Sequence, residues 1–69
     1  MTWRHLKIIL MLRNIAEKRE GIVLINDQAT WIDNWLWKSN PAFDGEYPAT
    51  LIEREREKSV YNHLKEMYP

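Results

Sequence analysis

Side chains that could carry out catalysis or bind a metal are few and scattered in this chain of 69 residues. The two histidines, His5 and His63, lie far apart, and cysteine is absent. A metal site needs three or four clustered ligands, so the sequence predicts no metal site, and without cysteine it has no disulfide. The chain also shows no nucleophile–base set and no glycine-rich phosphate loop, and it contains only two glycines.

Carboxylates occur at every second position in the segment EREREK, residues 53–58. A catalytic acid needs burial or a charged neighbour to shift its pKa, and a solvated alternation of Glu and Arg supplies neither. Such alternation is typical of a solvated helical face with weak i,i+4 pairs. We therefore expect a protein that is not an enzyme and needs no cofactor.

Aromatic residues are the remaining candidates for function, because the chain has four tryptophans and three tyrosines. A chain of this length buries only about 60% of its unfolded surface, so its core is thin. Binding energy at protein interfaces concentrates in Trp, Tyr and Arg. The predicted partner-binding residues are Trp31, Trp37, Tyr47, Arg54, Arg56, Tyr61 and Tyr68. The alternative interpretation is that these aromatics only cover the thin core.

A first helix is predicted over about residues 2–20, with Thr2 as N-cap and Gly21 as the helix stop. One face of its helical wheel carries Ile8, Ile9, Leu12, Ile15 and Ala16. A second apolar stripe on the opposite side consists of Trp3, Leu6 and Leu10. Either both stripes face the core, or the second stripe contacts another chain. The short chain has little material to cover both sides, which favours a homodimer with Trp3, Leu6 and Leu10 in its interface.

The middle of the chain is predicted as a connector over 21–26 and a helix over about 27–38, capped by Asn26 or Asp27. The run IVLI at 22–25 indicates a buried connector, or a short strand that pairs across a dimer axis. The core-facing stripe of the helix is Ala29, Ile32, Trp35 and Leu36, with Trp31 at its edge. Trp37 points away from this stripe, so either Phe43 or Tyr47 covers it or it belongs to a partner site.

A loop over 39–47 and a C-terminal helical segment over about 48–67 complete the chain, with Pro48 at the first helical position. Leu51 and Ile52 supply apolar contacts, and the stripe of the last helix is Val60, Leu64 and Met67. The sequence therefore predicts a single all-α domain over 1–69 with three to four helices and an ordered Pro/Gly loop. Whether the last two helices are continuous stays open.

Charge argues against nucleic acid as the main partner, because ten basic residues balance ten acidic ones. The charges are unevenly distributed: residues 1–20 carry five basic and two acidic residues, and residues 27–57 carry three basic and seven acidic ones. A chain with this asymmetry can pair with itself or meet a charged protein surface. Its longest apolar runs are too short for a signal peptide or a membrane span, so we expect a cytoplasmic protein and no membrane partner.

The stretch WLWKSNPAFDGEYPATLI, residues 35–52, resembles the toxin-binding C-terminal domain of Xre/MbcA/ParS family antitoxins. The matching positions are Trp35, Leu36, Asn40, Pro41, Phe43, Gly45, Pro48, Leu51 and Ile52, followed by Val60 and Leu64. The resemblance implies that the loop packs on the helices, with Phe43 in the core and Trp37 and Tyr47 nearer the surface. Two features depart from the family: Arg56 stands where a glycine is usual, and the N-terminal DNA-binding domain is missing.

Three functions follow as expectations. A free-standing chain of this size with this type of domain also resembles the quorum-sensing anti-activators of temperate phages, which bind a LuxR-type regulator of the host. We therefore expect a module that binds and inhibits a host or partner protein. The alternative is an antitoxin-like neutraliser of an ADP-ribosyltransferase-like toxin. A small helical DNA-binding protein is the third candidate, and the charge balance counts against it.

Overall fold

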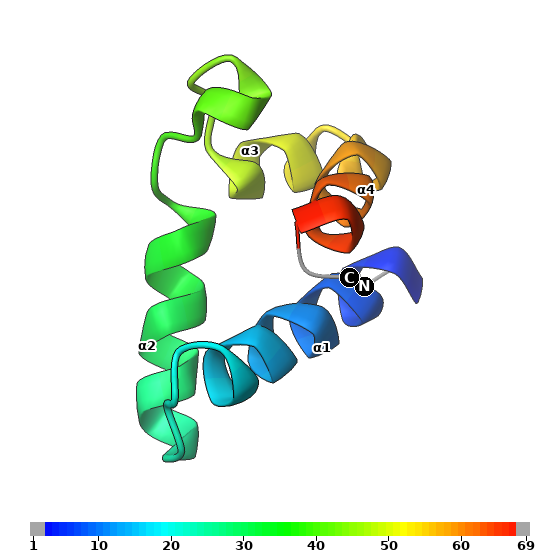
Figure 1. Ribbon diagram of the computed structural model, residues 1–69. Coiled ribbons are helices and arrows are strands. Elements are labelled where there is room, and N and C mark those ends of the chain that lie inside the picture. Colours follow the sequence, from blue (N-terminus) through cyan, green and yellow to red (C-terminus); the bar gives the residue numbers. More distant parts are fainter. Residues whose placement is uncertain (1–2, 68–69) are drawn as a thin grey trace.

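The computed structural model describes residues 3–67, and these residues form helices without any strand (Figure 1). The elements are α1 (Trp3–Lys18), α2 (Ile25–Leu36), a short 3-10 helix η1 (Pro41–Phe43), α3 (Pro48–Glu53) and α4 (Glu57–Met67). The predicted all-α class is confirmed. Helix α1 packs against α2, the next helix in the sequence, and also against α4, the last helix.

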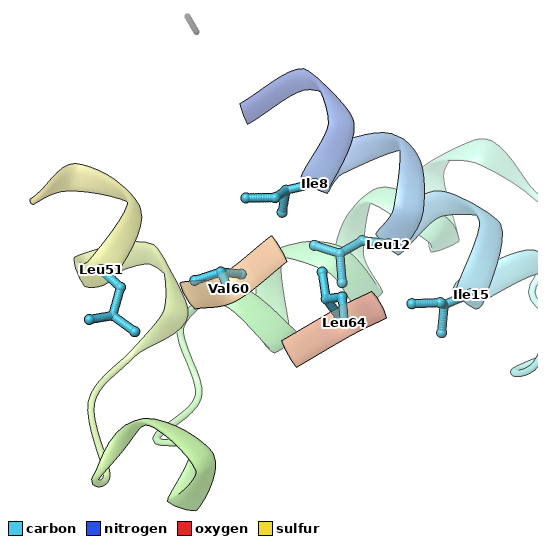
Figure 2. Packing of buried hydrophobic residues seen from close by; sticks show 6 residues of the cluster. All are labelled: Ile8, Leu12, Ile15, Leu51, Val60 and Leu64. Carbon is cyan, nitrogen blue, oxygen red and sulfur yellow. The ribbon is translucent and has the colours of Figure 1, made fainter. Parts of the chain in front are cut away.

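The hydrophobic core lies where α1, α3 and α4 meet (Figure 2). Its buried residues are Ile8, Leu12 and Ile15 of α1, Leu51 of α3, and Val60 and Leu64 of α4. The spacing of four and three residues along α1 places these side chains on one face of the helix, as the periodicity predicted. Ala16 is buried on the same face. Ile9, which the wheel also assigned to the core, is only partly buried.

Helix α2 turns most of its predicted apolar stripe toward the core, with Ala29 as the exception. Ala29 is exposed, so its assignment to the core stripe is wrong, and the buried residue of α2 is Gln28. Gln28 Nε2 donates hydrogen bonds to the carbonyl oxygens of Ile22 at 2.8 Å and Val23 at 3.5 Å. Through these hydrogen bonds the Gln28 side chain holds the α1–α2 connection against α2. Ile32, Trp35 and Leu36 are partly buried beside the core.

The connection between α1 and α2 is not the buried connector that the sequence predicted. Val23, Leu24 and Ile25 are 78%, 68% and 69% exposed. The predicted cap at Asn26 or Asp27 is also wrong, because α2 begins at Ile25 and its N-cap position, Leu24, makes no side-chain capping bond. Gln28 holds the connection through the carbonyls of Ile22 and Val23, which is a different contact from a cap on the first-turn amides.

A short strand over 22–25 would need free backbone groups, and several are already used within the chain. The Ile22 amide donates to the Ala16 carbonyl at 2.9 Å, and the Leu24 carbonyl accepts from the Gln28 amide at 2.9 Å. Gln28 Nε2 occupies the carbonyls of Ile22 and Val23. What this segment presents to solvent is its aliphatic side chains and not a backbone edge for strand pairing.

Replacement of Gln28 by methionine is expected to destabilise the protein by about 1–3 kcal/mol, because it keeps the volume and leaves buried carbonyls without their donor. Urea unfolding followed by helical circular dichroism measures this loss. Asn34→Met is the matched control, since Asn34 is exposed on the same helix and the substitution is the same in type. Equal stability of the two variants would show that the Gln28 hydrogen bonds contribute nothing.

The loop between α2 and α3 is closed by its own hydrogen bonds. Asn40 Oδ1 accepts from the Ala42 amide at 2.9 Å, which caps η1. The Asn40 carbonyl accepts from the amides of Phe43 and Gly45, both at 3.0 Å. Gly45 has φ of 81°, a left-handed conformation that glycine adopts at no steric cost, and Asp44 precedes it with φ of 56°. The Asn-Pro and Gly positions therefore fix a sharp path that brings Phe43 against the core.

Helices α3 and α4 are separate, which settles the point that the sequence left open. Residues 54–56 break the helix, with Glu55 in the left-handed region at φ of 61°. The Arg56 amide donates to the Leu51 carbonyl at 2.8 Å and closes the turn. A glycine is the usual residue for such a conformation, so Glu55 carries a steric cost here.

Candidate functional site

Acidic residues 53–57 do not form the continuous solvated helical face that their alternation predicted. Glu53 ends α3, Glu55 lies in the turn, and Glu57 opens α4 and is only 7% exposed. Arg4 Nη1 lies 3.8 Å from Glu57 Oε1, so this carboxylate anchors α4 to α1. Within residues 3–67 no group of three or more His, Cys, Asp or Glu side chains could hold a metal ion.

Trp37 and Tyr47 form a pair of aromatic rings at the surface, the aromatic edge. Their ring centroids lie 6.1 Å apart with the planes at 60°, an edge-to-face arrangement. Tyr47 therefore covers Trp37 in part, and yet Trp37 stays 50% exposed and Tyr47 45% exposed. Two aromatic rings hold each other in place while about half of their surface remains open to a binding partner.

The loop creates this pair by bringing its two ends together. Ser39 Oγ donates to the Gly45 carbonyl at 2.6 Å, and the Asn40 amide donates to the Glu46 carbonyl at 3.2 Å. Trp37 at the end of α2 and Tyr47 before α3 are thereby placed side by side. Arg54 Nη1 lies 3.4 Å from Oε1 of Glu46, the residue before Tyr47 in the sequence. This exposed ion pair contributes little to stability, about 0–1 kcal/mol.

An apolar groove of about 250 Å³ adjoins the aromatic edge. It opens where α1, α2 and α3 meet, and Trp37 belongs both to its wall and to the aromatic edge. The lining residues are His5, Ile9, Leu36, Trp37, Ala49, Ile52 and Glu53. Aliphatic and aromatic side chains with one or two charged groups at the margin are typical of binding sites. The sequence analysis did not identify this groove, because it assigned Ile9 to the core-facing stripe of the first helix.

The other predicted partner-binding residues lie away from this edge. Trp31 and Tyr61 are partly buried against the core, and Lys7 Nζ lies 5.7 Å from the centre of the Tyr61 ring. Arg56 is exposed and lines a separate polar cavity of about 360 Å³ between the loop and α4. The prediction for Tyr68 falls outside the described residues. The structure thus brings together Trp37 and Tyr47, and it pairs Arg54 with Glu46, the residue before Tyr47.

The prediction that Phe43 is a core anchor holds in part, since Phe43 packs against the core and is only partly buried. Its ring centroid lies 5.0 Å from that of His63 in an edge-to-face contact. Phe43→Ala is expected to cost about 2–3 kcal/mol, below the 3–5 kcal/mol typical of fully buried aromatics. Thermal melts measure the loss, with Tyr47→Ala as an exposed aromatic control on the same segment. A melting temperature within a degree or two of the wild type would show that Phe43 is not part of the core.

The stripe predicted for the dimer interface is open to solvent where it is described. Leu6 is 42% exposed and Leu10 is 52% exposed. Trp3 begins α1, and the prediction for its side chain falls outside what the structure describes. The described residues of the chain thus leave about half of the surface of this apolar pair, one turn apart on α1, exposed.

No helix within residues 3–67 has the length and apolar character to cross a membrane.

Comparisons of the chain with known protein families, with curated proteins and with solved structures found no match.

Proposed function

We propose that this protein is a non-enzymatic binding module that attaches to a partner protein through the aromatic edge and blocks a surface that the partner needs. The observation that carries the proposal is the pair of half-exposed rings, Trp37 and Tyr47, beside an apolar groove. Trp and Tyr are enriched among the few residues that dominate interface energy. Two rings that already contact each other lose little freedom on binding, which favours affinity.

Arg54 is a further candidate for the same surface, because it pairs with Glu46, the residue before Tyr47 in the sequence. A partner that fits this edge has an apolar pocket for the two rings and a polar rim for the Arg54–Glu46 pair. The balanced charge of the chain disfavours nucleic acid as the ligand.

Two resemblances supply the candidate partners: that of the chain's size and domain type to phage anti-activators, and that of residues 35–52 to the antitoxin family. One is a LuxR-type transcriptional regulator of a bacterial host, in which case the protein is a phage-encoded anti-activator that acts in the host cytoplasm. The other is an ADP-ribosyltransferase-like toxin, in which case the protein acts as an antitoxin. Both proposals use the same mechanism, the covering of a partner's surface by the aromatic edge.

The test is to titrate the purified protein into an activity assay of each purified candidate. Inhibition is expected to saturate at a fixed stoichiometric ratio, because each molecule covers one surface. Photo-crosslinking from a benzoylphenylalanine at position 47 should capture the inhibited candidate, and the same group at Lys58, exposed on α4, is the control. Inhibition at catalytic amounts, or equal crosslinking from positions 47 and 58, would contradict the proposal.

A further inference from the structure

We infer that the groove between α1, α2 and α3 receives Leu6 and Leu10 from a second copy of this chain. The two leucines are one helical turn apart on α1 and form an exposed ridge. The groove begins on the same helix, because Ile9 and His5 of α1 are part of its lining. A two-fold symmetric dimer needs a surface that complements itself, and a ridge next to a groove on one helix meets this condition.

The size of the groove suits this occupant. Its volume is about 250 Å³, and its walls are the apolar side chains of Ile9, Leu36 and Ile52 together with Trp37. An apolar cavity of about 150 Å³ already accepts a group of the size of benzene, so an aliphatic side chain has room here. Packing of an i,i+4 ridge into a groove is the usual way in which helices associate.

Charge determines which occupant the groove favours. From Trp3 to Asn14, α1 carries cations and no carboxylate. Arg4 is paired with Glu57, and Lys7 lies over the Tyr61 ring. Arg13, which lies between Ile9 and Leu6 on the helical wheel, has no ion-pair partner among residues 3–67.

Glu53 in the wall of the groove is likewise without an ion-pair partner among the residues described. A second copy whose leucine ridge enters the groove brings its Arg13 toward this carboxylate, and the two-fold axis forms the same pair twice. Opposite charges beside an apolar contact fix the orientation of the partner more than they add affinity.

This inference does not rest on the proposed function, because the oligomeric state is measured without any other protein. The two surfaces adjoin at Trp37, and Tyr47 lies outside the groove lining. Loss of the dimer and loss of the partner are therefore separable.

Sedimentation velocity across micromolar concentrations is the test. The wild type is expected to be a dimer at tens of micromolar, and Leu10→Glu a helical monomer over the same range. Arg13→Glu should weaken the dimer about fivefold, and Arg13→Glu/Glu53→Arg should return to within about twofold of the wild type, because the charge pair is restored across the interface. Lys58→Glu makes the same charge change on α4 and should leave the dimer unchanged.

A folded wild type that is monomeric at tens of micromolar would overturn the inference. So would a Leu10→Glu variant that remains a dimer, which would mean that the ridge is not in the interface. A double variant no tighter than Arg13→Glu alone would overturn the ridge-in-groove arrangement. A monomeric wild type that still binds a partner through Tyr47 would overturn this inference and leave the proposed function standing.

Discussion

Leu64→Ala is expected to remove most of the stability of the protein. Leu64 is fully buried at the centre of the core, between α4 and α1 (Figure 2). Removal of a buried leucine side chain costs about 2–5 kcal/mol, which includes the cavity left behind. A domain of this size has a total stability of roughly 3–10 kcal/mol, so the variant should be partly or fully unfolded at 37 °C. Urea unfolding monitored by helical circular dichroism measures the effect.

Met67→Ala is the matched control for Leu64→Ala, because Met67 lies one turn further along α4 and is 57% exposed. It should change the free energy of unfolding by no more than about 0.5 kcal/mol. If the two variants unfold at the same urea concentration, the core does not lie between α1 and α4 and the packing shown in Figure 2 is wrong.

Helix α1 was predictable from the sequence because one mechanism controls it. Ile8, Leu12 and Ile15 repeat with the helical period, and all three are buried. Val60 and Leu64 of α4 follow the same rule, since their i,i+4 spacing places both on the core-facing side of the helix. Where apolar spacing alone decides burial, the sequence is sufficient.

Helix α2 was harder to predict because a polar side chain competes for the buried face. Gln28 is buried and donates to two carbonyls of the preceding connection. It lies on the same side of the helical wheel as Ile32 and Trp35, but its polar side chain gave no reason to expect burial. Ala29, at the edge of the predicted stripe, is exposed, and Val23 and Leu24 before the helix are exposed as well. These hydrogen bonds form only where the chain turns back before α2, and the pattern of apolar residues in the sequence does not specify that turn.

The candidate site was predictable only in part, for a similar reason. The wheel placed Trp37 outside the core, and the structure finds it half exposed. Its contact with Tyr47 depends on the closure of the loop, and the groove depends on the meeting of three helices. The turn at Glu55 also had no local signal, because the sequence places no glycine there. Features that need several elements at once do not appear in a helical wheel.

Trp37→Ala and Tyr47→Ala are each expected to keep the fold and to lose the partner. Both rings are about half exposed, so their removal takes little from the core, and the edge-to-face contact contributes about 0.5–1.5 kcal/mol. The binding loss should reach the usual hot-spot threshold of about 2 kcal/mol, which is roughly a thirtyfold increase in Kd. Thermal melts and titration calorimetry with the partner measure the two quantities on the same samples.

Leu24→Ala is the control, because Leu24 is 68% exposed and lies before the first turn of α2, whereas Trp37 follows its last turn. It should leave both melting and partner affinity unchanged. Tyr47→Ala separates loss of partner binding from loss of the dimer. Tyr47 does not line the groove, so its removal should leave the oligomeric state unchanged. If every variant that fails to bind also fails to fold, the two rings have a structural role and the partner site lies elsewhere on the protein.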